Sequence, residues 1–147
     1  GHDYNYTKFT SKQIKSVLKL SKYLIKKYKI KYNFILGHSD IAPERKIDPG
    51  EKFPWEYLSK RKIGYWHNLN QKNLTKNRSQ KVFKADEKKF FKNLKKIGYS
   101  QKFIRKKIKY PKILKTAFQR RFRQDLINGI IDKECLIISN NLVKKFK

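Results

Sequence analysis

The segment between Gly37 and Pro54 places the strongest constraint on the fold of this chain. It holds three of the four prolines and two of the six glycines of the 147-residue sequence. Proline fixes one backbone angle and lacks an amide hydrogen, and glycine adopts turn conformations that other residues avoid. Neither a helix nor a strand can run far through such a segment. We therefore predict a folded loop here, with regular structure on both sides.

Regular structure is predicted directly before this loop. Thr10 and Gln13 form a capping-box pattern, and apolar residues then recur at helical spacing, which predicts a helix over residues 11–28. Residues 33–36, Asn-Phe-Ile-Leu, form a short apolar run that Gly37 stops. We interpret this run as a brief buried β-strand.

A polar segment divides the rest of the chain. Residues 68–79 are rich in Asn, Gln, Lys and Arg and almost free of apolar residues, which is typical of a linker. We predict a first domain over residues 1–66, a linker over 67–80 and a second domain over 81–147. The charge supports this division, because residues 1–66 hold 15 basic and 6 acidic side chains and the remainder holds 24 and 5.

The second domain is predicted to be a small bundle of three short helices. Asp86 can cap the first helix, which ends at Gly98, Pro111 opens the second, and Asp132 can cap the third. The apolar residues of these segments recur at helical spacing and would share one core. We place the single cysteine, Cys135, in this core, so no disulfide can form within the chain.

The net charge of +28 suggests a protein that binds nucleic acid or another polyanion. However, 32 of the 39 basic residues are lysines, and they are spread along the whole chain beside many Asn and Ile residues. This pattern is typical of a genome with a codon bias toward A and T. We therefore favour a solvated lysine surface and expect no nucleic-acid partner. No run of about 18 apolar residues occurs, so we expect no membrane-spanning helix.

His38, Lys46 and Asp48 are the loop residues with the clearest chemistry. Imidazole and carboxylate both suit zinc, which binds them at about 2.0–2.2 Å. The Lys46 ammonium could lie near the same centre, where a carbonyl oxygen gains negative charge during hydrolysis. The spacing alone leaves a second interpretation open, in which His38 bonds a carbonyl group and Asp48 caps its own turn.

The stretch from Gly37 to Leu58 resembles the C-terminal zinc-binding segment of the type 2 N-acetylmuramoyl-L-alanine amidases, the AmpD- and AmiD-like peptidoglycan hydrolases. The matching blocks are GHSDIAP, RK-DPG and FPW, in that order, and the likeness reaches back to Gln13 and forward to IGYW at residues 63–66. The resemblance implies an α/β fold, namely the C-terminal part of a mixed α/β zinc amidase domain. It also implies one catalytic Zn²⁺ and hydrolysis of the amide between N-acetylmuramic acid and L-alanine in peptidoglycan or muropeptides.

By position, the resemblance implies that His38 and Asp48 bind the zinc and that Lys46 stabilises the oxyanion. It also suggests that Arg45 contacts the substrate. The remaining acidic residues of the loop, Asp40 and Glu44, are expected to make loop hydrogen bonds and to contact solvent.

Two functional residues of the family have no counterpart here. The enzymes use a further histidine from an early strand and a glutamate from the middle of the domain, and both precede the region represented by this sequence. His2 falls in the loop before the first helix, and we expect His67 to be exposed beyond the end of the domain. We therefore expect two protein ligands and an inactive fragment of an amidase, truncated at its N-terminus. A remnant of a truncated or split gene is an alternative.

The second domain carries a resemblance of its own. AFQRRFR at residues 117–123 and INGIIDKE at 127–134 are similar to the core of the small three-helix peptidoglycan-binding domain that is often joined to such amidases. An unrelated three-helix bundle with a basic face is the alternative. In either case we assign Phe118 and Phe122 to the core.

The predicted function is therefore that of a zinc-dependent amidase acting on peptidoglycan or muropeptides. The alternative is a non-catalytic basic module that binds peptidoglycan or nucleic acid. We expect a monomer. The resemblance fits a location in the bacterial cytoplasm or in the cell envelope, at the periplasm or outer membrane.

Overall fold

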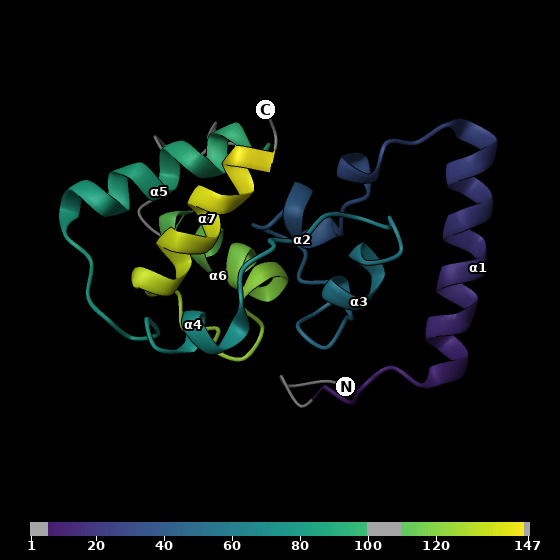
Figure 1. Cartoon of the computed structure of the whole chain (residues 1–147), viewed down its shortest axis with the longest axis horizontal. Coiled ribbons are helices and arrows are strands. Elements are labelled where there is room, and N and C mark those ends of the chain that lie inside the picture. The colour runs from purple at the N-terminus through teal and green to yellow at the C-terminus, as the bar shows by residue number, and fades with distance from the viewer. Residues whose placement is uncertain (1–5, 100–109, 146–147) are drawn as a thin grey trace.

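The computed structural model describes residues 6–99 and 110–145 of the chain. Its helices are, in order, α1 Ser11–Tyr28, the 3-10 helix η1 Tyr32–Phe34, α2 His38–Ile41, α3 Trp55–Ser59, α4 Gln71–Thr75, α5 Lys84–Lys96, α6 Tyr110–Phe122 and α7 Lys133–Lys145. Helices α4 to α7 form one group, α1 lies at the opposite end of the molecule, and α2 and α3 lie between them (Figure 1).

The predicted α/β fold is wrong for this chain. The described residues contain no β-strand, and their β-pairing is limited to one isolated bridge between Lys81 and Asp132. Residues 33–36, predicted as a strand, begin inside η1 and continue as extended backbone. A strand is held by hydrogen bonds to a neighbouring strand. Since no described segment pairs with residues 33–36, this run stays outside any sheet, and His38 begins a helix rather than following a strand.

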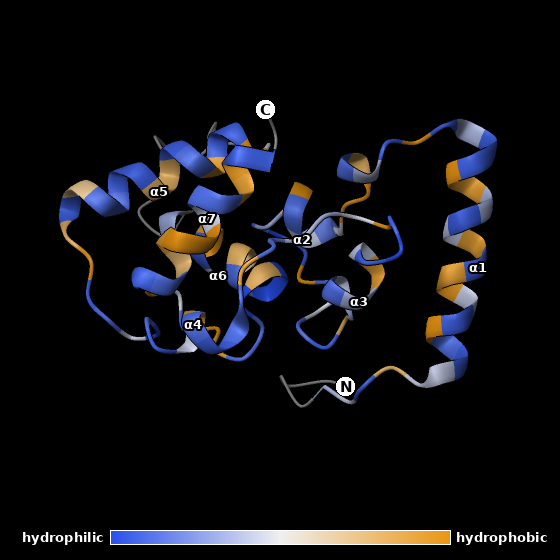
Figure 2. Ribbon diagram, in the orientation of Figure 1, coloured by the Kyte–Doolittle hydropathy of each residue, from blue (hydrophilic) through white to orange (hydrophobic). Residues whose placement is uncertain are grey.

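The helix predicted over residues 11–28 is confirmed as α1. The Thr10 hydroxyl accepts a hydrogen bond from the Gln13 amide at 3.2 Å, and the Gln13 side chain accepts one from the Thr10 amide at 2.8 Å. Apolar residues lie at intervals along this helix (Figure 2), yet none of its residues is buried. Val17 borders a small cavity together with Phe53 and Leu58, so one side of α1 covers the central loops.

The main core lies within the group α4 to α7. The Phe118 ring packs at 5.0 Å from the Phe90 ring and 5.2 Å from the Phe122 ring, measured between centroids. The predicted core positions of Phe118 and Phe122 are therefore confirmed. Cys135 is also buried here, and burial raises the pKa of its thiol to about 12. Its amide donates to the Asp132 carboxylate at 3.0 Å, which is the cap predicted for α7.

The segment 67–80, predicted as a linker, packs against the helical group. It contains α4, whose Leu74 is buried. Arg78 donates two hydrogen bonds to the Glu134 carboxylate at 2.7 and 3.0 Å. Tyr65, placed by prediction in the first domain, belongs to the core of the helical group. Residues 67–80 thus contribute both an apolar side chain and ion pairs to the helical group.

The prediction that His67 is exposed is wrong. Its side chain is 7% exposed, and its Nδ1 accepts a hydrogen bond from the Leu69 amide at 3.3 Å. The imidazole ring also lies 5.0 Å from the ring of Trp66. Burial lowers the pKa of His67 from 6.5 to about 4, because a charged imidazolium loses its hydration inside the protein.

We expect the folding stability to fall as the pH drops from 6.5 to about 4. In this window the unfolded chain binds a proton at His67 that the folded chain does not, so acid favours unfolding. Across the whole pH window, the free energy of unfolding is expected to fall by roughly 3 kcal/mol. Urea titrations at near-neutral and mildly acidic pH measure the loss, and His67→Asn should reduce it. An equal loss in the variant and in the original chain would contradict this assignment.

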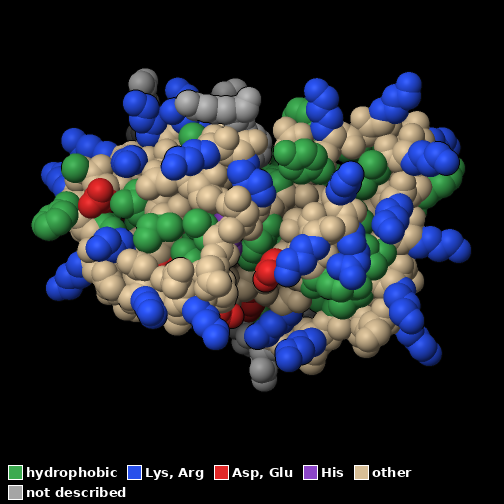
Figure 3. Space-filling model, viewed as in Figure 1, with side chains coloured by type: hydrophobic (Ala, Val, Ile, Leu, Met, Phe, Trp, Pro, Cys, Tyr) green, Lys and Arg blue, Asp and Glu red, His purple; other side chains and the backbone are tan. Residues whose placement is uncertain are grey.

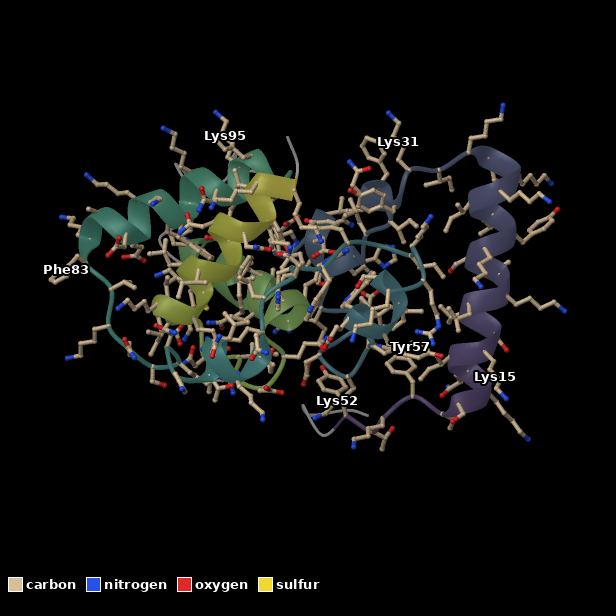
Figure 4. All side chains as sticks on the ribbon, in the orientation of Figure 1. Lys15, Lys31, Lys52, Tyr57, Phe83 and Lys95 are labelled. Carbon is tan, nitrogen blue, oxygen red and sulfur yellow. The ribbon has the colours of Figure 1, made fainter. Side chains whose placement is uncertain are left out.

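On the face shown in Figure 3, the basic side chains are scattered rather than gathered in one patch. Lys15, Lys31, Lys52 and Lys95 all point away from the ribbon (Figure 4). This arrangement fits a solvated lysine surface. Within residues 6–99 and 110–145, no helix combines the length and the apolar character that a membrane span needs.

Candidate metal centre

Gly37 allows the two ends of the loop that follows it to meet. A Cβ atom at this position would lie 2.6 Å from Cδ of Pro49, closer than real side chains approach. With glycine here, the Ser39 amide donates a hydrogen bond to the Asp48 carbonyl at 3.0 Å. The loop between residues 38 and 48 is thereby closed at its base.

His38 and Asp48 face each other across this closed loop. The His38 Nδ1 atom lies 2.6 Å from the Asp48 Oδ2 atom, and the two side chains are 65% and 56% exposed. An ionised carboxylate can only accept a hydrogen bond, so the proton of this bond belongs to Nδ1. The hydrogen bond from His38 lowers the pKa of Asp48 below its ordinary value. The loop therefore holds an imidazole and a carboxylate in contact at the surface.

The two basic residues of the loop, Lys46 and Arg45, are exposed. The positive charge of Lys46 helps to lower the pKa of Asp48, although Lys46 forms no ion pair in the part of the chain that the structure describes. The Arg45 guanidinium lies 3.7 Å from the Glu44 carboxylate, and its side chain is 72% exposed. Both side chains are thus free to turn toward a ligand.

A cavity of about 290 Å³ adjoins the His38 and Asp48 side chains. Val17 and Ser21 of α1 line one part of it, and Trp55 lines another. The pair therefore borders a hollow between α1 and the central loops, which offers room for a ligand beside it.

The donor set fits part of a zinc site. Catalytic zinc normally takes three protein ligands in a tetrahedral arrangement. His38 Nδ1 and Asp48 Oδ2 are suitable donors that face each other, and two such ligands about 2.1 Å from one ion would lie roughly 3.4 Å apart. Small side-chain rotations are enough to reach this separation. Among the described residues, however, no group of three or more His, Cys, Asp or Glu side chains could hold a metal ion, and His2 lies outside them.

Asp40 is the residue near this site that sequence reasoning misjudged. It makes the expected loop hydrogen bond, accepting from the Gly37 amide at 2.9 Å, but it is 8% exposed and does not face solvent. Its carboxylate also accepts hydrogen bonds from the Tyr99 hydroxyl at 2.8 Å and from the Arg121 guanidinium. Burial raises the pKa of Tyr99, so its hydroxyl stays protonated and donates.

One sequence signal pointed to this contact. Arg121 falls on the same helical stripe as Leu114, Ala117 and Phe118, which are core residues of α6. An arginine on an apolar stripe needs a buried acidic partner. Nothing in the sequence indicates that this partner is Asp40, which lies 81 positions away.

Comparison with known proteins places this chain beside peptidoglycan amidases. The Amidase_2 family, described as N-acetylmuramoyl-L-alanine amidase, matches residues 1–51. The N-acetylmuramoyl-L-alanine amidase AmiD of Escherichia coli is 32% identical over 141 residues, which are 96% of this chain and 51% of AmiD. The 1,6-anhydro-N-acetylmuramyl-L-alanine amidase AmpD of Haemophilus influenzae is 49% identical over 57 residues, 37% of this chain and 31% of AmpD. The chain thus spans about half the length of AmiD.

Two solved structures are also similar to this chain, and AmiD is one of them. Escherichia coli AmiD, in complex with the substrate anhydro-N-acetylmuramic acid-L-Ala-D-gamma-Glu-L-Lys, matches with a TM-score of 0.81 and 32% identity over 95% of this chain and 54% of that chain. AmpDh3 of Pseudomonas aeruginosa matches with a TM-score of 0.79 and 28% identity over 96% of this chain and 56% of that chain. The likeness therefore includes the C-terminal helices as well as the loop with His38 and Asp48.

Proposed function

We propose, because this chain is related to the AmpD- and AmiD-like type 2 N-acetylmuramoyl-L-alanine amidases, that it carries the C-terminal part of a zinc-dependent amidase site. The substrate would be the amide between N-acetylmuramic acid and L-alanine in peptidoglycan or muropeptides. AmiD itself was solved with an anhydromuramyl peptide. The observation that supports the proposal most is the 2.6 Å contact between His38 Nδ1 and Asp48 Oδ2.

In this proposal His38 and Asp48 hold one Zn²⁺, which when bound polarises the scissile carbonyl and acidifies water. The hydrogen bond between the two side chains keeps both donors on one side of the loop, and the closed base of the loop limits their separation. To bind the ion, Nδ1 of His38 would have to give up to solvent the proton that it donates to Asp48 in this structure. By the resemblance, the third ligand and the catalytic base of the related amidases precede the region that this sequence represents.

Lys46 and Arg45 would act on the substrate rather than on the metal. The Lys46 ammonium lies close enough to Asp48 to affect its pKa and can stabilise the negative charge that develops on the carbonyl oxygen. Arg45 would contact an anionic part of the muropeptide. We further propose that the C-terminal helices contact peptidoglycan, as their sequence likeness implies.

The test of this proposal is hydrolysis by a longer chain. Residues 1–147 would be joined to an N-terminal segment that supplies the missing histidine and glutamate. We expect this protein to release stem peptides from muropeptides, to lose the activity with a zinc chelator and to regain it with Zn²⁺. Intact muropeptides after incubation with the zinc-loaded protein would refute the amidase assignment.

The second candidate function is non-catalytic binding to an anionic polymer. The net charge of +28 favours it. Binding of nucleic acid would weaken steeply with added salt, in proportion to the number of phosphates contacted. Binding titrations at two salt concentrations separate this function from the amidase.

A further inference from the structure

Arg121 of α6 connects the C-terminal helices to the segment that carries His38. One of its terminal nitrogens donates to the Asp40 carboxylate, and the other donates to the Ile35 carbonyl at 3.2 Å. Asp40 lies two positions after His38, and Ile35 lies three positions before it. The Arg121 guanidinium therefore binds the backbone of Ile35 before His38 and the side chain of Asp40 after it.

The surroundings of Arg121 keep this guanidinium in place. The residue is 1% exposed, and its guanidinium carbon lies 3.9 Å from the centroid of the Trp55 ring. Cation–π contact with an aromatic face is strongest when both groups are removed from water. Trp55 begins α3, seven positions after Asp48, and borders the cavity beside the donor pair. Arg121 thus has little freedom to move without moving the loop.

Two further contacts run from the C-terminal part of the chain to the same region. The Tyr99 hydroxyl donates to the second oxygen of Asp40 at 2.8 Å. The Gln124 side chain, just beyond α6, donates to the Phe53 carbonyl at 2.9 Å. The loop is therefore fixed on both sides of the His38 and Asp48 pair by residues that lie far away in the sequence.

We infer that Arg121, with Tyr99, is a positioning residue that acts through Asp40 to hold His38 in the orientation that binds metal. The C-terminal helical group would then set the geometry of the loop that carries His38 and Asp48. This inference rests on the metal site of the proposed function. Groups that orient metal ligands from outside the first coordination shell commonly affect metal affinity by about 10- to 100-fold.

The experiment compares Arg121→Lys with Arg123→Lys in the full chain. Arg123 is a matched control because it is 3% exposed, pairs with the buried Asp132 and leaves the loop untouched. Lysine keeps the positive charge, but its single ammonium group cannot replace the two separate terminal nitrogens with which the guanidinium donates to Asp40 and Ile35. Competition with a chromogenic chelator measures the affinity for Zn²⁺ alone, and thermal unfolding measures stability.

We expect both variants to lower the unfolding temperature, but only Arg121→Lys to weaken zinc binding, by about tenfold or more. Equal zinc affinity in the two variants would overturn the inference, whether both stay normal or both fall. Should Arg121→Lys fail to fold, Tyr99→Phe tests the inference instead, since it removes the hydroxyl group that donates a hydrogen bond to Asp40. It should weaken zinc binding severalfold, and an unchanged affinity would count against the inference.

A second readout does not depend on the metal. Long-range proton–nitrogen NMR spectra, recorded at a pH where imidazole is neutral, report which ring nitrogen of His38 carries the proton. We expect the Nδ1-protonated form in the original chain and in Arg123→Lys, and a mixture in Arg121→Lys. An unchanged form in Arg121→Lys refutes the positioning role. If His38→Ala leaves zinc binding unchanged, the proposed metal site is refuted. The NMR spectra of the original chain and of Arg121→Lys still test the positioning role of Arg121.

Discussion

Arg121→Ala should destabilise the chain by about 3–5 kcal/mol, because it leaves the Asp40 carboxylate buried without its cation. Asp40 is 8% exposed and Arg121 is 1% exposed, so water cannot replace the lost partner without opening the structure. The variant also loses the contact between the guanidinium and Trp55. Urea unfolding of the full chain, followed by tryptophan fluorescence, measures the change in the free energy of unfolding.

A double variant without either charge separates two effects of Arg121→Ala, namely the unpaired Asp40 carboxylate and the loss of buried side-chain volume. Asp40→Asn with Arg121→Met removes both charges and keeps most of the buried volume. We expect it to be more stable than Arg121→Ala, since replacing a whole buried ion pair costs far less than removing one partner. A loss of less than about 1 kcal/mol in Arg121→Ala would show that the two groups are not a buried pair.

Replacement of His38 or Asp48 by alanine should abolish zinc binding at the loop. Loss of a direct ligand exceeds the roughly 10- to 100-fold effect of an outer partner, so we expect a decrease of more than about 100-fold for either variant. The same substitutions in the N-terminally extended protein should remove muropeptide hydrolysis. Chelator competition and peptide release measure the two effects.

Lys46→Ala is the matched control for these ligand variants. It lies in the same exposed loop but is assigned to the oxyanion and not to the metal. We expect nearly unchanged zinc affinity and a fall in kcat of the extended protein by about 10² to 10³. If Lys46→Ala weakens zinc binding as much as His38→Ala does, then the loop, and not a specific pair of ligands, controls the metal.

Local signals in the sequence predicted where α1 and α7 begin, whereas η1, α2 and α4 were not predicted. The capping box at Thr10 and Gln13 marks the start of α1, and Asp132 caps α7 as expected. These caps are formed by residues three positions apart, so the local sequence alone is enough to predict them. The proximity of His38 and Asp48 could likewise be expected from the loop, because both residues lie within one closed turn of chain.

Features that depend on distant partners were not accessible in this way. The run at residues 33–36 has the composition of a strand, but strand formation depends on a neighbour that the described chain does not provide. The burial of His67 and the pairing of Asp40 with Arg121 arise from packing between segments far apart in sequence. Periodicity identifies a buried face and does not say which segment covers it.

A zinc titration of the full chain, observed at the His38 imidazole by proton–nitrogen NMR, tests the central claim most directly. We expect added Zn²⁺ to shift the resonance of a deprotonated Nδ1 in the original chain, and to do so only at much higher concentration in Asp48→Ala. A His38 resonance that stays unchanged while Zn²⁺ binds elsewhere on the chain would contradict the claim that this imidazole and this carboxylate hold one metal ion.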